Sequence, residues 1–140
     1  MTERLAAPRV VVLADDLIWQ TRLTTVLEDV GAQVVRARTA AAFEAAIAGA
    51  EFAIVDLTAR AYQPVPAIQL AHDGGLRVLG VGQHDDLAQR REALAAGAER
   101  VFAYRKLFED GPATLSAWLE GNPLLRAGST ALPAQTGPTE

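Results

Sequence analysis

Residues 9–16, RVVVLADD, join a run of β-branched and aliphatic residues to two consecutive acids, and residues 52–56, FAIVD, repeat the pattern with one acid. Each run has the composition of a strand that is covered on both faces, as in a parallel sheet. The carboxyl ends of parallel strands meet at one edge, where open α/β sheets place their ligand sites. The sequence therefore predicts that Asp15, Asp16 and Asp56 converge on one crevice.

Three carboxylates in one crevice destabilise a fold unless a cation or hydrogen-bond donors compensate their charge. Mg²⁺ suits a site of one or two carboxylates, a few waters and a phosphoryl oxygen. The acid pattern therefore predicts bound Mg²⁺ and phosphoryl chemistry.

The composition indicates one domain with one hydrophobic core. The chain has 140 residues, half of them hydrophobic, and no Cys, which excludes a thiolate nucleophile, a Cys-based zinc site and disulfides. Its net charge of −4 and scattered Arg residues argue against a nucleic-acid partner. No apolar stretch reaches membrane-spanning length, so we expect no membrane association and a cytoplasmic location. Residues 122–140 are rich in Pro, Gly, Thr, Ser and Ala, which predicts a domain over residues 1–121 followed by a disordered C-terminal tail.

Short β-branched runs alternate with stretches of helical period along residues 9–120. The predicted strands are residues 9–14, 33–36, 52–56, 76–81 and 100–104, and the last helix is expected to start near residues 110–112. Five such units predict an α/β, flavodoxin-like (βα)5 three-layer sandwich with a parallel sheet of order 2-1-3-4-5. That order places its switch point between the two strands that end in acid. The expected strand core is Val10, Val12, Ile54, Val55, Val78 and Val81.

Over about residues 9–120 the chain resembles the receiver domain of two-component response regulators. The resemblance rests on the acidic pair Asp15-Asp16, on the single Asp56 and on the Ala-Gly-Ala segment at residues 96–98. It implies that Asp56 accepts a phosphoryl group from a histidine kinase. It also implies that Asp15 and Asp16 bind Mg²⁺, directly or through water, with the backbone carbonyl of Thr58 completing the metal site.

Two positions depart from the receiver pattern. Gly82 stands where the family has Thr or Ser, and Tyr104 stands where it has Lys. Lys106, the single lysine of the chain, lies two residues after Tyr104. It is either a charge partner of the acids or a solvated loop residue. Arg105 could replace it if a bulge turned its side chain inward. His84, after the fourth predicted strand, is either exposed or a donor to a phosphoryl oxygen.

Each acid also has a purely structural interpretation. Asp16 is placed to cap the following helix, with Asp15 as its solvated neighbour, and Asp56 could form a turn at the end of its strand.

Three functions follow from this pattern. The first is a stand-alone, atypical receiver in phosphorelay signal transduction, a phosphoprotein that acts by protein–protein binding and is no enzyme beyond self-phosphorylation and dephosphorylation. The second keeps the fold without the chemistry, as a phosphorylation-independent pseudo-receiver that binds a signalling protein or forms a homodimer through its last two helices. The third is a small Mg²⁺-dependent phosphatase-like hydrolase.

Overall fold

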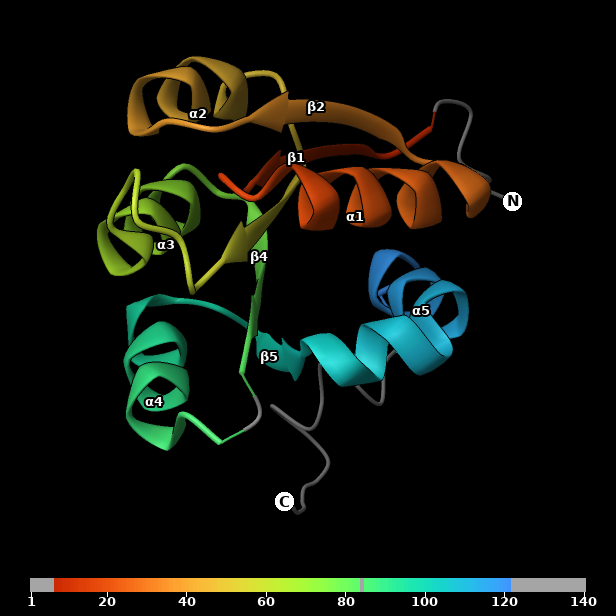
Figure 1. Cartoon of the computed structure of the whole chain (residues 1–140). Coiled ribbons are helices and arrows are strands. Elements are labelled where there is room, and N and C mark those ends of the chain that lie inside the picture. The colour runs from red at the N-terminus through yellow and green to blue at the C-terminus, as the bar shows by residue number, and fades with distance from the viewer. Residues whose placement is uncertain (1–6, 84, 122–140) are drawn as a thin grey trace.

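The computed structural model describes residues 7–83 and 85–121. In these residues strands and helices alternate along the chain (Figure 1). In order the elements are β1 (Arg9–Leu13), α1 (Leu17–Asp29), β2 (Gln33–Ala37), α2 (Ala40–Ile47), β3 (Phe52–Asp56), α3 (Pro64–Asp73), β4 (Arg77–Gly82), α4 (Leu87–Ala96), β5 (Arg100–Ala103) and α5 (Tyr104–Leu119).

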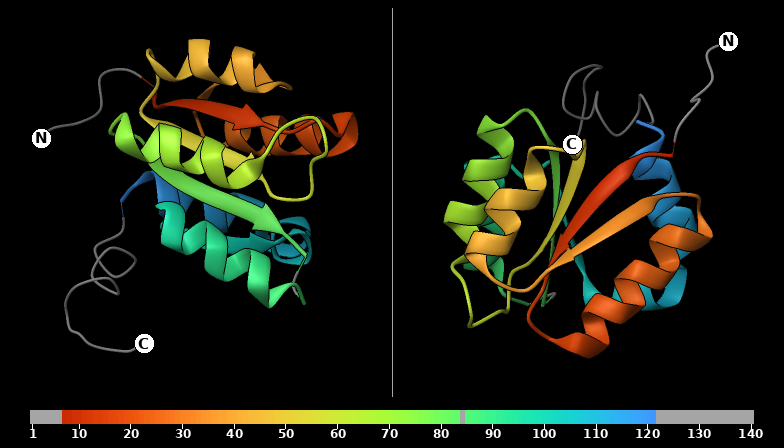
Figure 2. Two further views of the ribbon diagram at one scale, coloured as in Figure 1. Left: turned by 90° about the vertical axis from the view of Figure 1, so that its left-hand side faces the viewer. Right: turned by 90° about the horizontal axis from the view of Figure 1, so that it is seen from above.

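The strands form one parallel sheet in the order β2-β1-β3-β4-β5, which confirms the predicted flavodoxin-like topology. β1 lies between β2 and β3, with Val12 opposite both Arg36 and Ile54. The chain changes direction across the sheet at β1 and β3, so the ends of these two strands flank the switch point. Figure 2 shows the strand arrows pointing to the same edge.

The helices cover both faces of the sheet: α2, α3 and α4 lie on one face, and α1 and α5 on the other (Figures 1 and 2). Each face has its own apolar cluster, one built on Val11, Val55 and Val78 and the other on Val10 and Ile54. The six strand residues predicted for the core are fully buried, which confirms that prediction: Val10, Val12, Ile54, Val55, Val78 and Val81.

Side-chain caps start three of the helices. Asp16 Oδ1 accepts hydrogen bonds from two backbone N–H groups at the start of α1, and Thr39 and Asp86 cap α2 and α4 in the same way. α4 ends at Gly97, whose φ of 126° is a conformation that L side chains rarely adopt. A Cβ atom there would lie 2.5 Å from the ring of His72, so only glycine lets the end of α4 pack against α3.

The start of the last helix differs from the sequence prediction. We expected the fifth strand to include Tyr104 and the helix to begin near residues 110–112, but β5 ends at Ala103 and α5 begins at Tyr104. Asp110 has the non-helical angles φ −145° and ψ 36°, so α5 consists of two segments joined by a kink. Pro112 lies in the first turn of the second segment, where its missing N–H has little cost. Pro112 therefore marks the start of the second segment. The first segment follows Ala103, which makes no capping hydrogen bond with its side chain.

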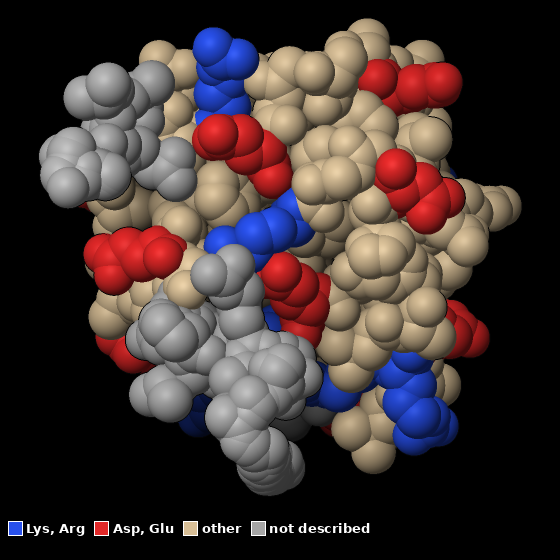
Figure 3. All heavy atoms as spheres, turned by 180° about the vertical axis from the view of Figure 1, so that it is seen from behind, with Lys and Arg blue, Asp and Glu red and all other residues tan. Residues whose placement is uncertain are grey.

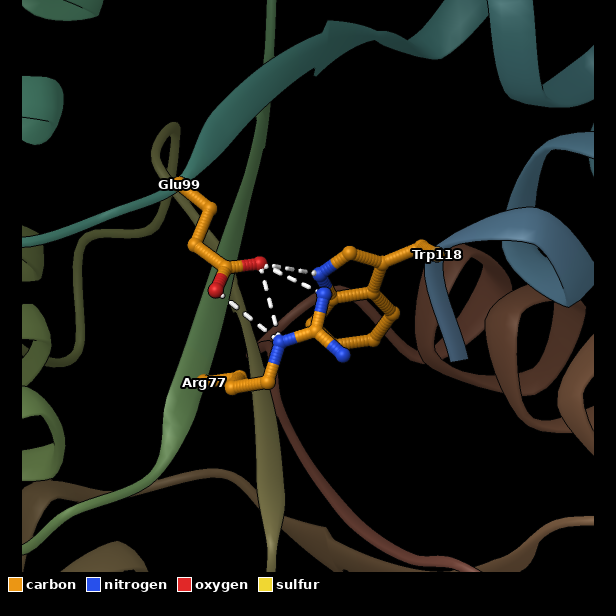
Figure 4. A network of polar contacts seen from close by, with 3 residues as sticks. All are labelled: Arg77, Glu99 and Trp118. Atoms are coloured by element: carbon orange, nitrogen blue, oxygen red, sulfur yellow. Dashed lines mark hydrogen bonds and ion pairs between the residues drawn. The ribbon is translucent and has the colours of Figure 1, made fainter. Parts of the chain in front are cut away.

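A polar network holds the opposite edge of the sheet. The Arg77 guanidinium, at the start of β4, donates to both carboxylate oxygens of Glu99, and Trp118 Nε1 donates to Glu99 Oε1 at 3.0 Å (Figure 4). The same guanidinium lies over the rings of Phe52 and Trp118, 5.4 and 5.8 Å from their centroids. The network therefore joins β4, the residue before β5 and the end of α5.

The surface agrees with the charge balance of the sequence. Acidic and basic side chains are interspersed on the face that Figure 3 shows, without a broad basic patch. Among the residues that the structure covers, no helix has the length and apolarity to cross a lipid bilayer. The predicted tail, residues 122–140, lies outside the described residues, and the predicted domain boundary therefore stays a prediction.

We expect Glu99→Ala to lower the free energy of unfolding by about 1–2 kcal/mol, because it leaves the Arg77 and Trp118 donors without their acceptor. Urea denaturation followed by circular dichroism measures the change. Glu109→Ala is the matched control: it removes an exposed i,i+4 pair with Arg105 and should cost less than about 0.5 kcal/mol. Equal losses for the two variants would contradict the structural role of the network.

Candidate functional site

The two acids after β1 each bind backbone N–H groups. Asp15 Oδ2 accepts hydrogen bonds from the N–H groups of Arg60 and Ala61, both at 2.9 Å, so it holds the loop between β3 and α3. Slight burial raises the pKa of the Asp15 carboxyl, but the two N–H donors outweigh it, so the pKa lies below its ordinary value. Asp16 Oδ1 accepts from the N–H groups of Ile18 and Trp19 at 2.9 and 3.2 Å. The helix-cap interpretation of Asp16 is therefore confirmed.

Asp56 is the last residue of β3 and is 1% exposed. Its Oδ1 accepts hydrogen bonds from the backbone N–H and the hydroxyl of Thr58, at 2.9 and 2.8 Å, and from the hydroxyl of Tyr104. Its Oδ2 is buried and has no hydrogen-bond partner among the described residues. The two carboxylate oxygens thus have unequal surroundings, one with three donors and one with none.

Tyr104 brings its phenol to Asp56 because α5 begins directly after β5. Its ring stacks on Trp19 of α1, with centroids 4.1 Å apart, and its hydroxyl lies 2.8 Å from the Thr58 hydroxyl. Burial, followed by the hydrogen bond to Asp56, raises the pKa of Tyr104 well above its ordinary value of 10.0. The residue in the usual lysine column is therefore a neutral donor already bound to the acid.

Gly82, the last residue of β4, is surrounded by the side chains of Gln89 and Leu57. A Cβ atom there would lie 3.2 Å from Gln89 Oε1 and 3.3 Å from Leu57 Cδ1, so a larger residue would displace these side chains. Gln89 is held in place because its Nε2 donates to the Leu57 carbonyl at 2.6 Å. The position where receivers carry a hydroxyl is thus filled by the amide of Gln89 and the side chain of Leu57.

The structure does not bring Lys106 to the acids. Lys106 lies in the first segment of α5, where its Nζ is 3.9 Å from Asp110 Oδ2, and Arg105 pairs with Glu109 in the same segment. The charge-partner interpretation of either cation assumed an extended strand, and the early start of the helix instead gives each of them an i,i+4 partner. His84 lies outside the described residues.

The arrangement does not supply a ready metal cage. Within residues 7–83 and 85–121, no three acids or histidines lie close enough together to hold a metal ion. Asp15 and Asp16 each use one oxygen on backbone donors, and the side chain and N–H of Thr58 bind Asp56. Each of the two acids keeps a second carboxylate oxygen that these hydrogen bonds do not use, and the predicted Mg²⁺ site stays a prediction.

The side chains of Tyr62 and Gln20 also hold this edge of the sheet together, which the sequence did not predict. The Tyr62 hydroxyl lies 2.9 Å from the Leu13 carbonyl and 2.7 Å from the Asp56 carbonyl, so it ties the ends of β1 and β3 together. Its burial, together with the nearby Asp56 and Asp15 charges, raises its pKa far above the ordinary value. Gln20 Nε2 donates to the carbonyls at the ends of β1 and β2. Neither residue belongs to a motif, so no signal in the sequence marks it.

Comparison with known proteins identifies the fold. No protein-family model and no curated protein matches this sequence. A response regulator of Burkholderia pseudomallei, solved with a phosphorylated aspartic acid, a calcium ion and citrate, is 20% identical over 91% of this chain and 75% of its own, with a TM-score of 0.71. A CheY-like receiver domain of Methanospirillum hungatei is 22% identical over 84% of this chain and all of its own, with a TM-score of 0.66. The receiver domain of NarL from Mycobacterium tuberculosis is 20% identical over 84% of this chain and 99% of its own, with a TM-score of 0.72.

The chain has the fold of response-regulator receiver domains. Asp15 and Asp16 lie just after β1, and Asp56 is the last residue of β3, as the resemblance to receiver domains implies. The departures are equally concrete: Tyr104 is bound to Asp56, and Gly82 is enclosed by Gln89 and Leu57.

We expect neither of the two tyrosines, Tyr62 and Tyr104, to ionise near pH 10 while the protein is folded. A folded-state pKa above the unfolded value gives stability that is complete below pH 10 and is lost as the pH rises further. Absorbance at 295 nm should therefore show phenolate only together with loss of the circular dichroism signal. Tyr104→Phe, which leaves Tyr62 alone, should halve the final amplitude. A phenolate step near pH 10 in the folded protein would contradict the two buried hydrogen bonds.

Proposed function

We propose that the chain is a receiver-type signalling module that acts by binding other proteins while Asp56 stays unphosphorylated. The hydrogen bond from the Tyr104 hydroxyl to Asp56 Oδ1 is the observation that carries the proposal. It puts a neutral donor on the acid at the position where receivers have a lysine, and the donor belongs to the same packed unit as Trp19.

Among the described residues, the surroundings of Asp56 also depart from the donor set that receivers use for phosphoryl transfer. Charge on a transferring phosphoryl group is stabilised by donors and cations held ready for it, and loss of one such group costs about a hundredfold in rate. Gly82 offers no hydroxyl, and Lys106 is paired with Asp110 instead. Phosphorylation of Asp56 would also require its buried Oδ2, or the Oδ1 that Tyr104 binds, to become accessible to the phosphoryl donor. These features favour the binding module over the phosphorelay receiver.

The exposed side of α4 supports output through protein binding. Leu87 and Leu94 are 58% and 42% exposed, and they lie seven residues apart, on one side of the helix. Large aliphatic side chains that remain in water on one helix face mark an interaction surface. A signalling protein or a second copy of this chain would contact this face.

A second candidate is the phosphoryl-accepting receiver, and the unpartnered Oδ2 of Asp56 favours it. A buried carboxylate oxygen without a donor is costly, and a bound cation or a bond to phosphorus would remove that cost. In this candidate a histidine kinase supplies the phosphoryl group to Asp56. Asp15, Asp16 and the Thr58 carbonyl would hold Mg²⁺, which supplies positive charge for the phosphoryl oxygens. Asp15 and Asp16 would each have to use their second carboxylate oxygen. No feature of the described residues favours the hydrolase.

Intact-mass spectrometry after incubation with Mg²⁺ and acetyl phosphate separates the two candidates. We expect no phosphoryl adduct on the native chain, because Tyr104 donates to Asp56 where receivers have a lysine, and Gly82 has no hydroxyl. Tyr104→Lys should gain a detectable adduct that Asp56→Asn in the same background abolishes. Rapid labelling of the native chain that Asp56→Asn removes would overturn the proposal and support the phosphoryl-accepting receiver. Slower labelling in Lys106→Ala would then assign that lysine as the charge partner.

A Mg²⁺ titration followed by ¹H–¹⁵N NMR tests the metal site separately. Trp19 lies one helical turn from Asp16, so a cation held by the acid pair should shift its indole resonance. The proposed binding module predicts no shift at millimolar Mg²⁺, with Trp118 as the internal reference. A saturable shift at Trp19 that Asp15→Asn abolishes would instead establish the predicted Mg²⁺ site.

A further inference from the structure

A cavity of about 350 Å³ lies between α1 and the first segment of α5, away from the crevice that holds Asp56. Its walls include Trp19, Arg22 and Val26 from α1, and Leu107 and Phe108 from α5. None of the described residues that line it is acidic. Its volume lies in the range of sites for small organic molecules, which bury most of their surface between apolar side chains and a few polar groups.

Arg22 is the one charged side chain among the described residues that line the cavity. Its guanidinium lies over the rings of Trp19 and Phe108, 5.6 and 5.1 Å from their centroids, so aromatic contacts on both helices hold it at the cavity. Among the described residues it has no carboxylate partner and no hydrogen bond, although Arg77, Arg105 and Lys106 all have acidic partners. A guanidinium has five N–H donors in a planar fork that matches a carboxylate. The cavity therefore offers a positioned and unpaired anion donor.

Phe108 adds an apolar surface that the fold does not use. It is 68% exposed, although the adjacent Leu107 is buried in the core. A planar apolar group in the cavity would cover this ring and the exposed side of Trp19 together. The charge of Arg22 and the apolar rings of Trp19 and Phe108 thus favour the same ligand class, a small molecule with one planar apolar group and one carboxylate.

We propose that the cavity between α1 and α5 binds a small aromatic carboxylate, with Arg22 on the carboxylate and Trp19 and Phe108 on the apolar group. The site goes beyond the proposed function and does not depend on whether Asp56 is phosphorylated. It is nevertheless connected to Asp56, because Trp19 both lines the cavity and stacks on Tyr104. A ligand that moves Trp19 would thus act on the phenol that binds Asp56.

The probe is 1-naphthylacetate, and 1-naphthylacetamide is its neutral counterpart of nearly the same shape. In ¹H–¹⁵N NMR titrations of the full chain, the acid should give saturable shifts of the Trp19 indole and of backbone amides in the facing parts of α1 and α5. The Trp118 indole, held by Glu99 at the opposite edge of the sheet, should not move. The acid should bind about tenfold more tightly than the amide, as expected for one charge-assisted contact.

Arg22→Gln should lower the affinity for the acid about tenfold more than the affinity for the amide, and so remove the preference for the acid. Arg91→Gln, an exposed arginine of α4 remote from the cavity, should leave both affinities unchanged. Equal binding of acid and amide by the native chain, or an acid affinity that Arg22→Gln does not lower, would overturn the proposal.

Two other occupants of the cavity give different results. If a second copy of the chain fills it, sedimentation velocity should show a dimer that Phe108→Ala dissociates. If residues 122–140 fill it, their removal should shift the Trp19 indole in the absence of any probe. Either result, like a complete lack of shifts with the acid, would overturn the small-molecule assignment.

Discussion

The buried carboxylate of Asp56 sets the conditions that the surrounding structure has to meet. It lies at the end of a strand covered by helices on both faces, so water cannot solvate it, and a buried charged group without donors is strongly unfavourable. Thr58 supplies two of its donors from the loop that follows, and Tyr104 supplies the third from across the sheet edge. The placement of Tyr104 in turn requires α5 to start directly after β5. The junction of β5 and α5 is thus linked to Asp56, at the end of β3, through the hydrogen bond from Tyr104.

Hydrophobic patterning was sufficient for the architecture. The near-continuous apolar runs identify strands buried on both faces, the stretches between them have helical period, and right-handed crossovers leave few strand orders. The cap of α1 was likewise visible as Asp16 before a stretch of helical period. These features depend on local sequence, which explains why they could be predicted from it.

The contacts within the site could not be predicted, because they depend on where side chains from distant segments meet. Tyr104 was recognised as a departure from the receiver pattern, but its hydrogen bond to Asp56 required the unexpected first segment of α5. The same segment took Lys106 away from the acids. Thr58 was considered only for its carbonyl, whereas its hydroxyl and N–H bind Asp56. The positions of Arg105 and Lys106 were inferred for an extended strand, and this inference fails because these residues lie in a helix.

The network of Arg77, Glu99 and Trp118 has a mechanical consequence for α5. It anchors the end of the helix to the sheet, while the kink at Asp110 separates the anchored part from the two turns that carry Tyr104 and Phe108. The first segment is fixed separately, because Leu107 packs in the core and the Tyr104 hydroxyl binds Asp56. The last helix is thus attached to the domain at two points, one on each side of the kink, and these points lie at opposite edges of the sheet.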